Sequence, residues 1–221
     1  MTIYAFGCSI AHGADLVFPN QHKANTEFSY PNLVAQSLGV ECNNYAVCGM
    51  SNEGIFHKTI NVLNECDEAT AVIVGWTSDV REYWEVDGRQ WFFIPSWCAT
   101  THADNELKFI KDYTGSDINF QPRVCADEEQ YLEILNKMYE YLFKYKFDLT
   151  EYRNKKFNYM NCIRLYCKQR NFKLIETSSM DNTLDLHIKH NLDNFGTWRK
   201  GLGHPTKEDH QQIAQQILLT L

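Results

Sequence analysis

Ala71-Val72-Ile73-Val74-Gly75 is an unbroken apolar run, mostly β-branched, that stops at a glycine. A run of this kind is typical of a strand that is buried on both faces, as in a parallel sheet covered by helices on both sides. Two further strands are expected before it, over Ile3–Phe6 and Val40–Tyr45, and another after it, over Phe172–Glu176. The segments between these strands therefore decide the fold.

Helix signals alternate with the strands. Pro31 stands at the start of an apolar pattern that Gly39 is placed to end, and Ser51 is placed to cap a second helix. A helix over about Glu151–Arg170 precedes the last strand, and Thr206–Asp209 resembles a capping box that opens a final helix. This alternation predicts a three-layer α/β/α fold with a mainly parallel central sheet.

The chain has 221 residues, which fits a single domain over 1–221 with insertions over about 80–170. Tyr83–Trp97 predicts a hairpin that turns at Asp87-Gly88, followed by a long loop over about 99–126 and a helix that opens at Asp127. The aromatic side chains of this hairpin are interpreted as hairpin core or subunit contact. A stacking surface for sugars or bases is the alternative.

The charge is acidic, at −7, with 28 Asp and Glu against 21 Lys and Arg. Nucleic acids and anionic membranes need a basic surface, so neither is expected as a partner. The one short basic run, Arg153–Lys156, is interpreted as a solvated helix face.

The segment Met1–Phe6 lacks the basic start and the long apolar run of a secretion signal, and no stretch is long enough for a membrane helix. A cytoplasmic location is therefore expected. The eight cysteines are irregularly spaced without a Cys-x-x-Cys pair, so reduced thiols are expected and a metal site is not.

Three segments are expected at the carboxyl edge of the sheet, where α/β folds place functional residues: Gly7–Ser9, Ala46–Asn52 and Gly75–Ser78. Ser9 directly follows the first strand, where a tight turn would present its hydroxyl as a nucleophile. A helix cap or turn serine is the alternative. His204 lies in the Gly- and Pro-framed loop 201–206, where it would serve as a base or would order the helix start.

Four blocks resemble those of the SGNH (GDSL-like) hydrolases. Gly7-Cys8-Ser9 resembles the first block, usually Gly-Asp-Ser, and Asn44–Asn52 resembles the second. Val72–Ser78 resembles the third, and Gly201–Pro205 resembles the last, usually Asp-x-x-His-Pro. The blocks stand in family order and span nearly the whole chain, and the Gly-Trp-Thr-Ser form of the third resembles tailed-phage proteins. The resemblance implies the flavodoxin-like fold of these hydrolases.

The resemblance also implies roles for individual residues. Ser9 would be the nucleophile and His204 the general base, and the oxyanion hole would comprise Ser9, Gly49 and Thr77. Substrate contacts are expected from Asn52, Trp76 and Ser78 within these blocks and from Arg81 shortly after the third, with a surface ion pair as the alternative for Arg81. Cys8 is an alternative nucleophile, but neighbouring side chains on a turn diverge and the family motif aligns Ser9.

Two positions depart from the family pattern. Thr77 replaces the asparagine whose amide donates to the oxyanion, and Gly201 replaces the aspartate that orients the base. Loss of that acid costs about 10⁴ in rate in a serine protease. Asp193, Asp185 or a backbone carbonyl are the candidate substitutes.

The sequence thus predicts an ester hydrolase or acyltransferase that needs no cofactor. Its substrate would be an acyl or acetyl ester of a small molecule or a carbohydrate, in the cytoplasm, or in the host cytoplasm if the chain is phage-encoded. A catalytically decayed SGNH-fold binding protein is the main alternative, favoured by Gly201 and Thr77. An enzyme acting on nucleotides at the same edge is a third.

Overall fold

The computed structural model describes residues 2–14, 16, 26–77, 82–86, 89–93, 149–178, 188–189 and 205–221. Within these ranges a five-stranded sheet runs in the order β2-β1-β3-β6-β7, and every neighbouring pair is parallel. Its strands are β1 (Thr2–Gly7), β2 (Glu41–Asn44), β3 (Ala71–Trp76), β6 (Leu174–Ser178) and β7 (Ile188–Lys189). The predicted α/β class with a parallel sheet is confirmed.

The strand order identifies the sheet edge at which a ligand is expected to bind. Taken in chain order, the five strands lie 2-1-3-4-5, which is the flavodoxin-like arrangement. The direction of winding reverses between β1 and β3, which pair up to Gly7 opposite Gly75. In open parallel sheets ligands bind at such a reversal, beyond the carboxyl ends of the strands. Here that position is the edge where β1 leads into Ser9 and β3 into Thr77.

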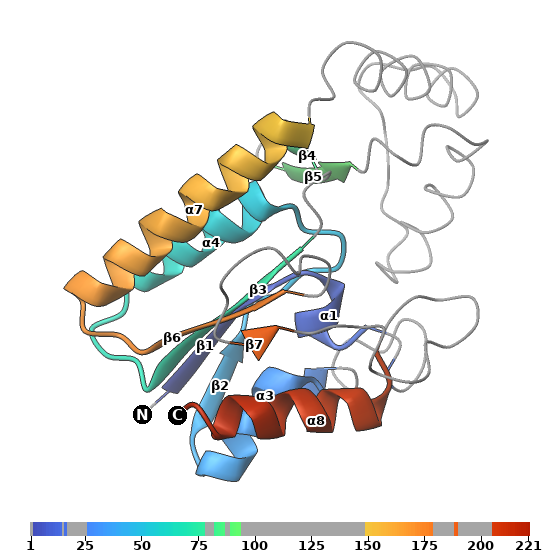
Figure 1. Cartoon of the computed structure of the whole chain (residues 1–221), viewed down its shortest axis with the longest axis vertical. Coiled ribbons are helices and arrows are strands. Elements are labelled where there is room, and N and C mark those ends of the chain that lie inside the picture. Colours follow the sequence, from blue (N-terminus) through green and yellow to red (C-terminus); the bar gives the residue numbers. More distant parts are fainter. Residues whose placement is uncertain are drawn as a thin grey trace.

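Helices cover both faces of the sheet (Figure 1). One face packs against the short helix α1 (Ser9–His12), α3 (Tyr30–Leu38) and α8 (Lys207–Leu218). The other packs against α4 (Asn52–Asn64) and α7 (Leu149–Gln169), which lie side by side. Each face has its own apolar cluster, because successive strand residues alternate between the two sides. The expected three layers are confirmed.

Local signals in the sequence identify the helix ends correctly. Ser51 Oγ accepts from the Gly54 N–H (3.1 Å), and Thr206 forms the capping box with Asp209. Gly39 ends α3 in the left-handed conformation, at φ 66°, which glycine adopts without steric cost. Strand β6 begins at Leu174, two residues later than expected, because the Phe172 N–H donates to the Cys167 carbonyl at the end of α7 (2.8 Å).

The central region is described in part. Strands β4 (Glu82–Val86) and β5 (Arg89–Phe93) pair antiparallel with Val86 opposite Arg89, as the predicted hairpin requires, while Asp87 and Gly88 lie outside the described residues. The loop expected over 99–126 and the helix expected from Asp127 lie outside the described residues. Helix α7 packs beside α4 and contributes Met160, Ile163 and Cys167 to the core.

One prediction about the basic run is wrong in part. Arg153, Asn154 and Lys155 are exposed on α7, as expected for a solvated face. Lys156 is only 2% exposed, because it falls on the same side of the helix as the buried Met160 and Ile163. None of the helices in the described ranges combines the length and hydropathy that crossing a membrane requires.

We predict that thiol titration of the denatured protein without reductant will find all eight cysteines free. The structure contains six of them as thiols outside any disulfide, within the described ranges: Cys8, Cys42, Cys48, Cys66, Cys162 and Cys167. Burial raises the pKa of the Cys42 and Cys167 thiols to about 12, which suppresses the thiolate that oxidation needs. A titre below eight in freshly purified protein, restored by reductant, would contradict this prediction.

Candidate active site

Ser9 lies where β1 leads into α1, and α1 packs closely against the sheet. A Cβ atom on Gly7 would lie 2.7 Å from the Ala11 Cβ and 3.0 Å from the Gly75 carbonyl oxygen. Only a residue without a side chain therefore lets α1 begin directly over the sheet. Ser9 is the first residue of this helix and is 5% exposed. The local fold thus holds the Ser9 backbone at the winding reversal, as a nucleophile at this edge requires.

The segment that carries Gly49 is joined to β1 and α1. The Val47 N–H donates to the Gly7 carbonyl (3.0 Å), and Asn44 Nδ2 donates to the Ala11 carbonyl (2.9 Å). His12 Nδ1 lies 3.1 Å from the Ala46 carbonyl oxygen. Gly49 turns the chain with φ 81°, in the left-handed region. These contacts hold the second expected segment beside the end of β1 and the last residues of α1.

Thr77 follows β3 and is buried at 1% exposure. Its N–H donates to Asn52 Oδ1 (2.9 Å), and its carbonyl accepts from Asn52 Nδ2 (3.2 Å). Asn52 is the first residue of α4 and belongs to the segment that follows Gly49. The three segments expected at the carboxyl edge are therefore joined to one another by hydrogen bonds, with Asn52 linking the second to the third.

Cys8 is the N-cap of α1, and its side chain belongs to the apolar cluster under α3 and α8. It is buried, as a packing residue would be. Ser78, Arg81 and His204 lie outside the described residues, as do Gly201 and both candidate substitute acids, Asp185 and Asp193.

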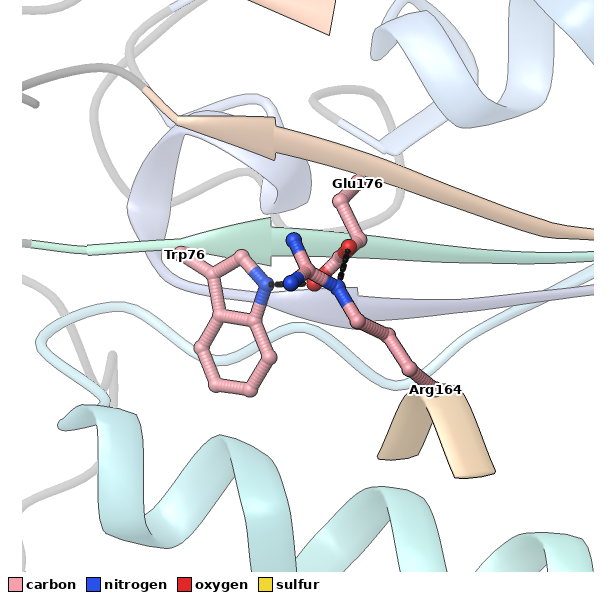
Figure 2. Close-up of polar contacts among 3 residues, drawn as sticks. All are labelled: Trp76, Arg164 and Glu176. Carbon is pink, nitrogen blue, oxygen red and sulfur yellow. Dashed lines mark hydrogen bonds and ion pairs between the residues drawn. The ribbon is translucent and has the colours of Figure 1, made fainter. Parts of the chain in front are cut away.

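Trp76 has a buried polar partner that sequence analysis missed. Its indole is 1% exposed, and Nε1 donates to Glu176 Oε1 (2.9 Å), while Arg164 Nε donates to Glu176 Oε2 (2.6 Å; Figure 2). The three residues come from β3, β6 and α7. Burying a carboxylate is costly unless it is paired in this way. The indole of Trp76, a residue expected to contact substrate, is directed into the layer between sheet and helix.

Removing the Glu176 carboxylate should destabilise the fold. Glu176→Ala leaves the buried Trp76 N–H without its acceptor and opens a cavity, so we expect a loss of about 2–4 kcal/mol in unfolding free energy. Glu176→Gln keeps an acceptor for the indole and should cost less. Urea denaturation measures both, with the exposed Glu68→Ala as the control. Equal stability of Glu176→Ala and Glu68→Ala would contradict the bridging role.

Tyr30 forms buried hydrogen bonds on the other face of the sheet, near the same carboxyl edge. Its hydroxyl lies 3.0 Å from Thr177 Oγ1, and its N–H donates to His210 Nδ1 (2.9 Å). Burial raises the pKa of the Tyr30 hydroxyl well above its usual value, so it stays neutral. His210 lies on the first turns of α8, close after the buried Pro205. The bond from the Tyr30 N–H to His210 thereby attaches the start of α8, which follows the loop that contains His204, to α3.

Gly75 is required because the Tyr30 hydroxyl occupies the space of a side chain. A Cβ on Gly75 would lie 2.7 Å from Tyr30 Oη. We expect Gly75→Ala to lower the unfolding free energy by about 1–3 kcal/mol through overpacking. Adding Tyr30→Phe, which removes the hydroxyl, should recover part of that loss. Thermal unfolding of the single and double variants tests this, and strictly additive losses would contradict the contact.

Comparisons with known proteins give a fold likeness only. No family model matches the chain, and no curated protein matches it. Among solved structures, a member of the lipolytic protein G-D-S-L family from Veillonella parvula is 15% identical, with a TM-score of 0.40 over 100% of this chain and 98% of that one. The psychrotrophic esterase EstA from Pseudoalteromonas sp. is 12% identical, with a TM-score of 0.36 over 98% and 93%.

A family two carbohydrate esterase from Cellvibrio japonicus is also similar, at 11% identity and a TM-score of 0.39, over 99% of this chain and 59% of that one. The likeness is thus to G-D-S-L lipolytic proteins and carbohydrate esterases, at low identity. A function for this chain has to be inferred from its own residues.

Proposed function

We propose that this chain is a serine ester hydrolase or acyltransferase of the SGNH type, with Ser9 as nucleophile and His204 as general base. The supporting observation is the position of Ser9, which begins α1 directly after β1, at the winding reversal of a 2-1-3-4-5 sheet. The segments that carry Gly49 and Thr77 are joined to the same edge. A nucleophile and two candidate oxyanion donors therefore share the edge where such sheets bind ligands.

The proposed reaction proceeds in two steps. Ser9 Oγ attacks the acyl carbonyl, and His204 takes the serine proton and delivers it to the departing alcohol. Water, or an acceptor alcohol in a transferase, then attacks the acyl-enzyme and releases Ser9. The N–H groups of Ser9 and Gly49, with the Thr77 hydroxyl, stabilise the oxyanion that forms in both steps.

The proposed substrate is an acyl or acetyl ester, including one carried by a carbohydrate. The similar structures include proteins named as esterases and carbohydrate esterases, which is compatible with this class. Ser78 and Arg81 remain the proposed substrate contacts. Asn52 and Trp76, whose side chains also bond within the protein, stay predictions for that role.

A catalytically decayed binding protein of the same fold is the second candidate. It is favoured by Gly201, where the family has the aspartate that orients the base, and by Thr77 in place of the family asparagine. Ser9 and His204 would then persist without turnover.

Hydrolysis of p-nitrophenyl acetate separates the two candidates. If the chain is an enzyme, we expect saturable turnover above the uncatalysed rate, with an initial burst of p-nitrophenol if the acyl-enzyme accumulates. Ser37→Ala, on the exposed side of α3, is a control for loss of a serine hydroxyl elsewhere and should keep full activity. Wild-type protein no faster than buffer would favour the binding protein.

A further inference from the structure

The side-chain amide of Asn52 forms hydrogen bonds with both polar groups of the Thr77 backbone. Its amide oxygen accepts from the Thr77 N–H, and its amide nitrogen donates to the Thr77 carbonyl. Thr77 lies just past β3, beyond the sheet pairing that ends at Trp76 opposite Ser178. Buried backbone groups at such a position need partners from outside the ladder. Asn52 supplies both.

Asn52 is itself rigidly held. It is 6% exposed and opens α4, and the preceding Ser51 caps that helix by accepting from the Gly54 N–H. Trp76, the residue that precedes Thr77, is held by the hydrogen bond from its indole to Glu176. The segment that ends β3 is therefore fixed at two consecutive residues, by a side chain bond at Trp76 and by backbone bonds at Thr77.

This arrangement connects two parts of the proposed oxyanion hole. Asn52 follows Gly49 by three residues, and its bonds to Thr77 span the gap between the second and third segments. Oxyanion donors act only when they are held in place before charge develops, and a misplacement of about 1 Å can cost 10²-fold in rate. We propose that Asn52 is a positioning residue that sets the separation between the Gly49 N–H and the Thr77 hydroxyl, an inference that rests on the proposed function.

The choice of amino acid fits this role. Aspartate at position 52 would keep the acceptor for the Thr77 N–H but would turn a second oxygen toward the Thr77 carbonyl. Leucine has a similar shape and offers neither bond. Asn52→Leu therefore removes both bonds to Thr77 and Asn52→Asp removes one of them. Thr77→Val removes the hydroxyl while leaving the backbone in place.

The test is a double-mutant cycle in which activity and stability are measured separately. We expect Asn52→Leu to lower kcat by about 10–100-fold with KM changed less than about twofold, because an oxyanion donor acts on the transition state. In the Thr77→Val background the same change should lower kcat much less. The stability losses should remain additive, because Asn52 bonds the backbone and not the hydroxyl of Thr77.

Asn64→Leu is the matched control. Asn64 is the last residue of the same helix, and its Oδ1 accepts from the Tyr166 hydroxyl (2.8 Å). Because Asn64 is exposed, this variant should change stability little and keep kcat. Hydrogen exchange of the Thr77 amide, followed by NMR, gives a readout without substrate, and protection should fall in Asn52→Leu.

The outcomes separate the inference from the function on which it rests. An Asn52→Leu variant that loses stability but keeps wild-type kcat would overturn the positioning role alone. So would an equal fall in kcat with and without the Thr77 hydroxyl. A wild-type protein no more active than Ser9→Ala would overturn the proposed function and the positioning role with it. An intermediate kcat for Asn52→Asp supports the two-bond account.

Discussion

Ser9→Ala is expected to abolish ester hydrolysis while leaving the fold intact. The substitution removes one oxygen atom at the first position of α1 and introduces the best helix former, so the expected change in unfolding free energy is below about 1 kcal/mol. The fall in kcat should reach the limit of detection, because loss of the nucleophile costs about 10⁶-fold in a serine protease. Steady-state hydrolysis of p-nitrophenyl acetate, with circular dichroism to verify folding, measures both quantities.

Two comparisons test whether the loss of activity is specific to the Ser9 hydroxyl. Cys8→Ala removes the neighbouring thiol and should retain most of the activity, because the Cys8 side chain packs in the apolar cluster rather than at the proposed site. Wild-type and Ser9→Ala proteins of equal activity would show that the hydrolysis comes from elsewhere.

Gly201→Asp is expected to raise turnover if nothing else orients His204. Without a carboxylate behind it, an imidazole base is free to rotate and to adopt the wrong tautomer, and loss of that acid costs about 10⁴ in a serine protease. Restoring the acid should recover part of that factor in kcat, and Ser9→Ala in the same background should abolish the gain. The measurement is kcat for a series of acyl esters.

Gly203→Asp is the matched control, because it adds the same charge to the same loop, adjacent to His204 instead of at the family position. It should not raise turnover. If Gly201→Asp leaves an active wild type unchanged and Asp193→Asn or Asp185→Asn abolishes activity, one of those acids already orients the base. That outcome would contradict the account of Gly201 as an uncompensated loss.

The parts of the fold that sequence predicted correctly depend on local signals. Pro31 and Gly39 bound α3, and Ser51 and Thr206 cap α4 and α8, since each acts within a few residues of its own position. The carboxyl ends of β1 and β3 were likewise predictable, because the apolar run of each stops at a glycine, Gly7 and Gly75. The position of Ser9 at the sheet edge follows from these features alone.

The missed features depend on contacts between distant segments. Trp76 and Glu176 are 100 residues apart, and nothing near either residue shows that the indole will donate to that carboxylate. Asn52 and Thr77 are 25 apart, and their amide-to-backbone bonds became visible only with the packing of α4 against β3. Side-chain direction, rather than segment position, was therefore the unpredictable part of the site.

Labelling with a fluorophosphonate, followed by peptide mass spectrometry, tests the central claim most directly, because the reagent reacts covalently with an activated serine. The account predicts a single adduct on Ser9, lost in Ser9→Ala and strongly reduced in His204→Ala. No adduct at a reagent concentration that labels a known serine hydrolase, or an adduct on any residue other than Ser9, would contradict it.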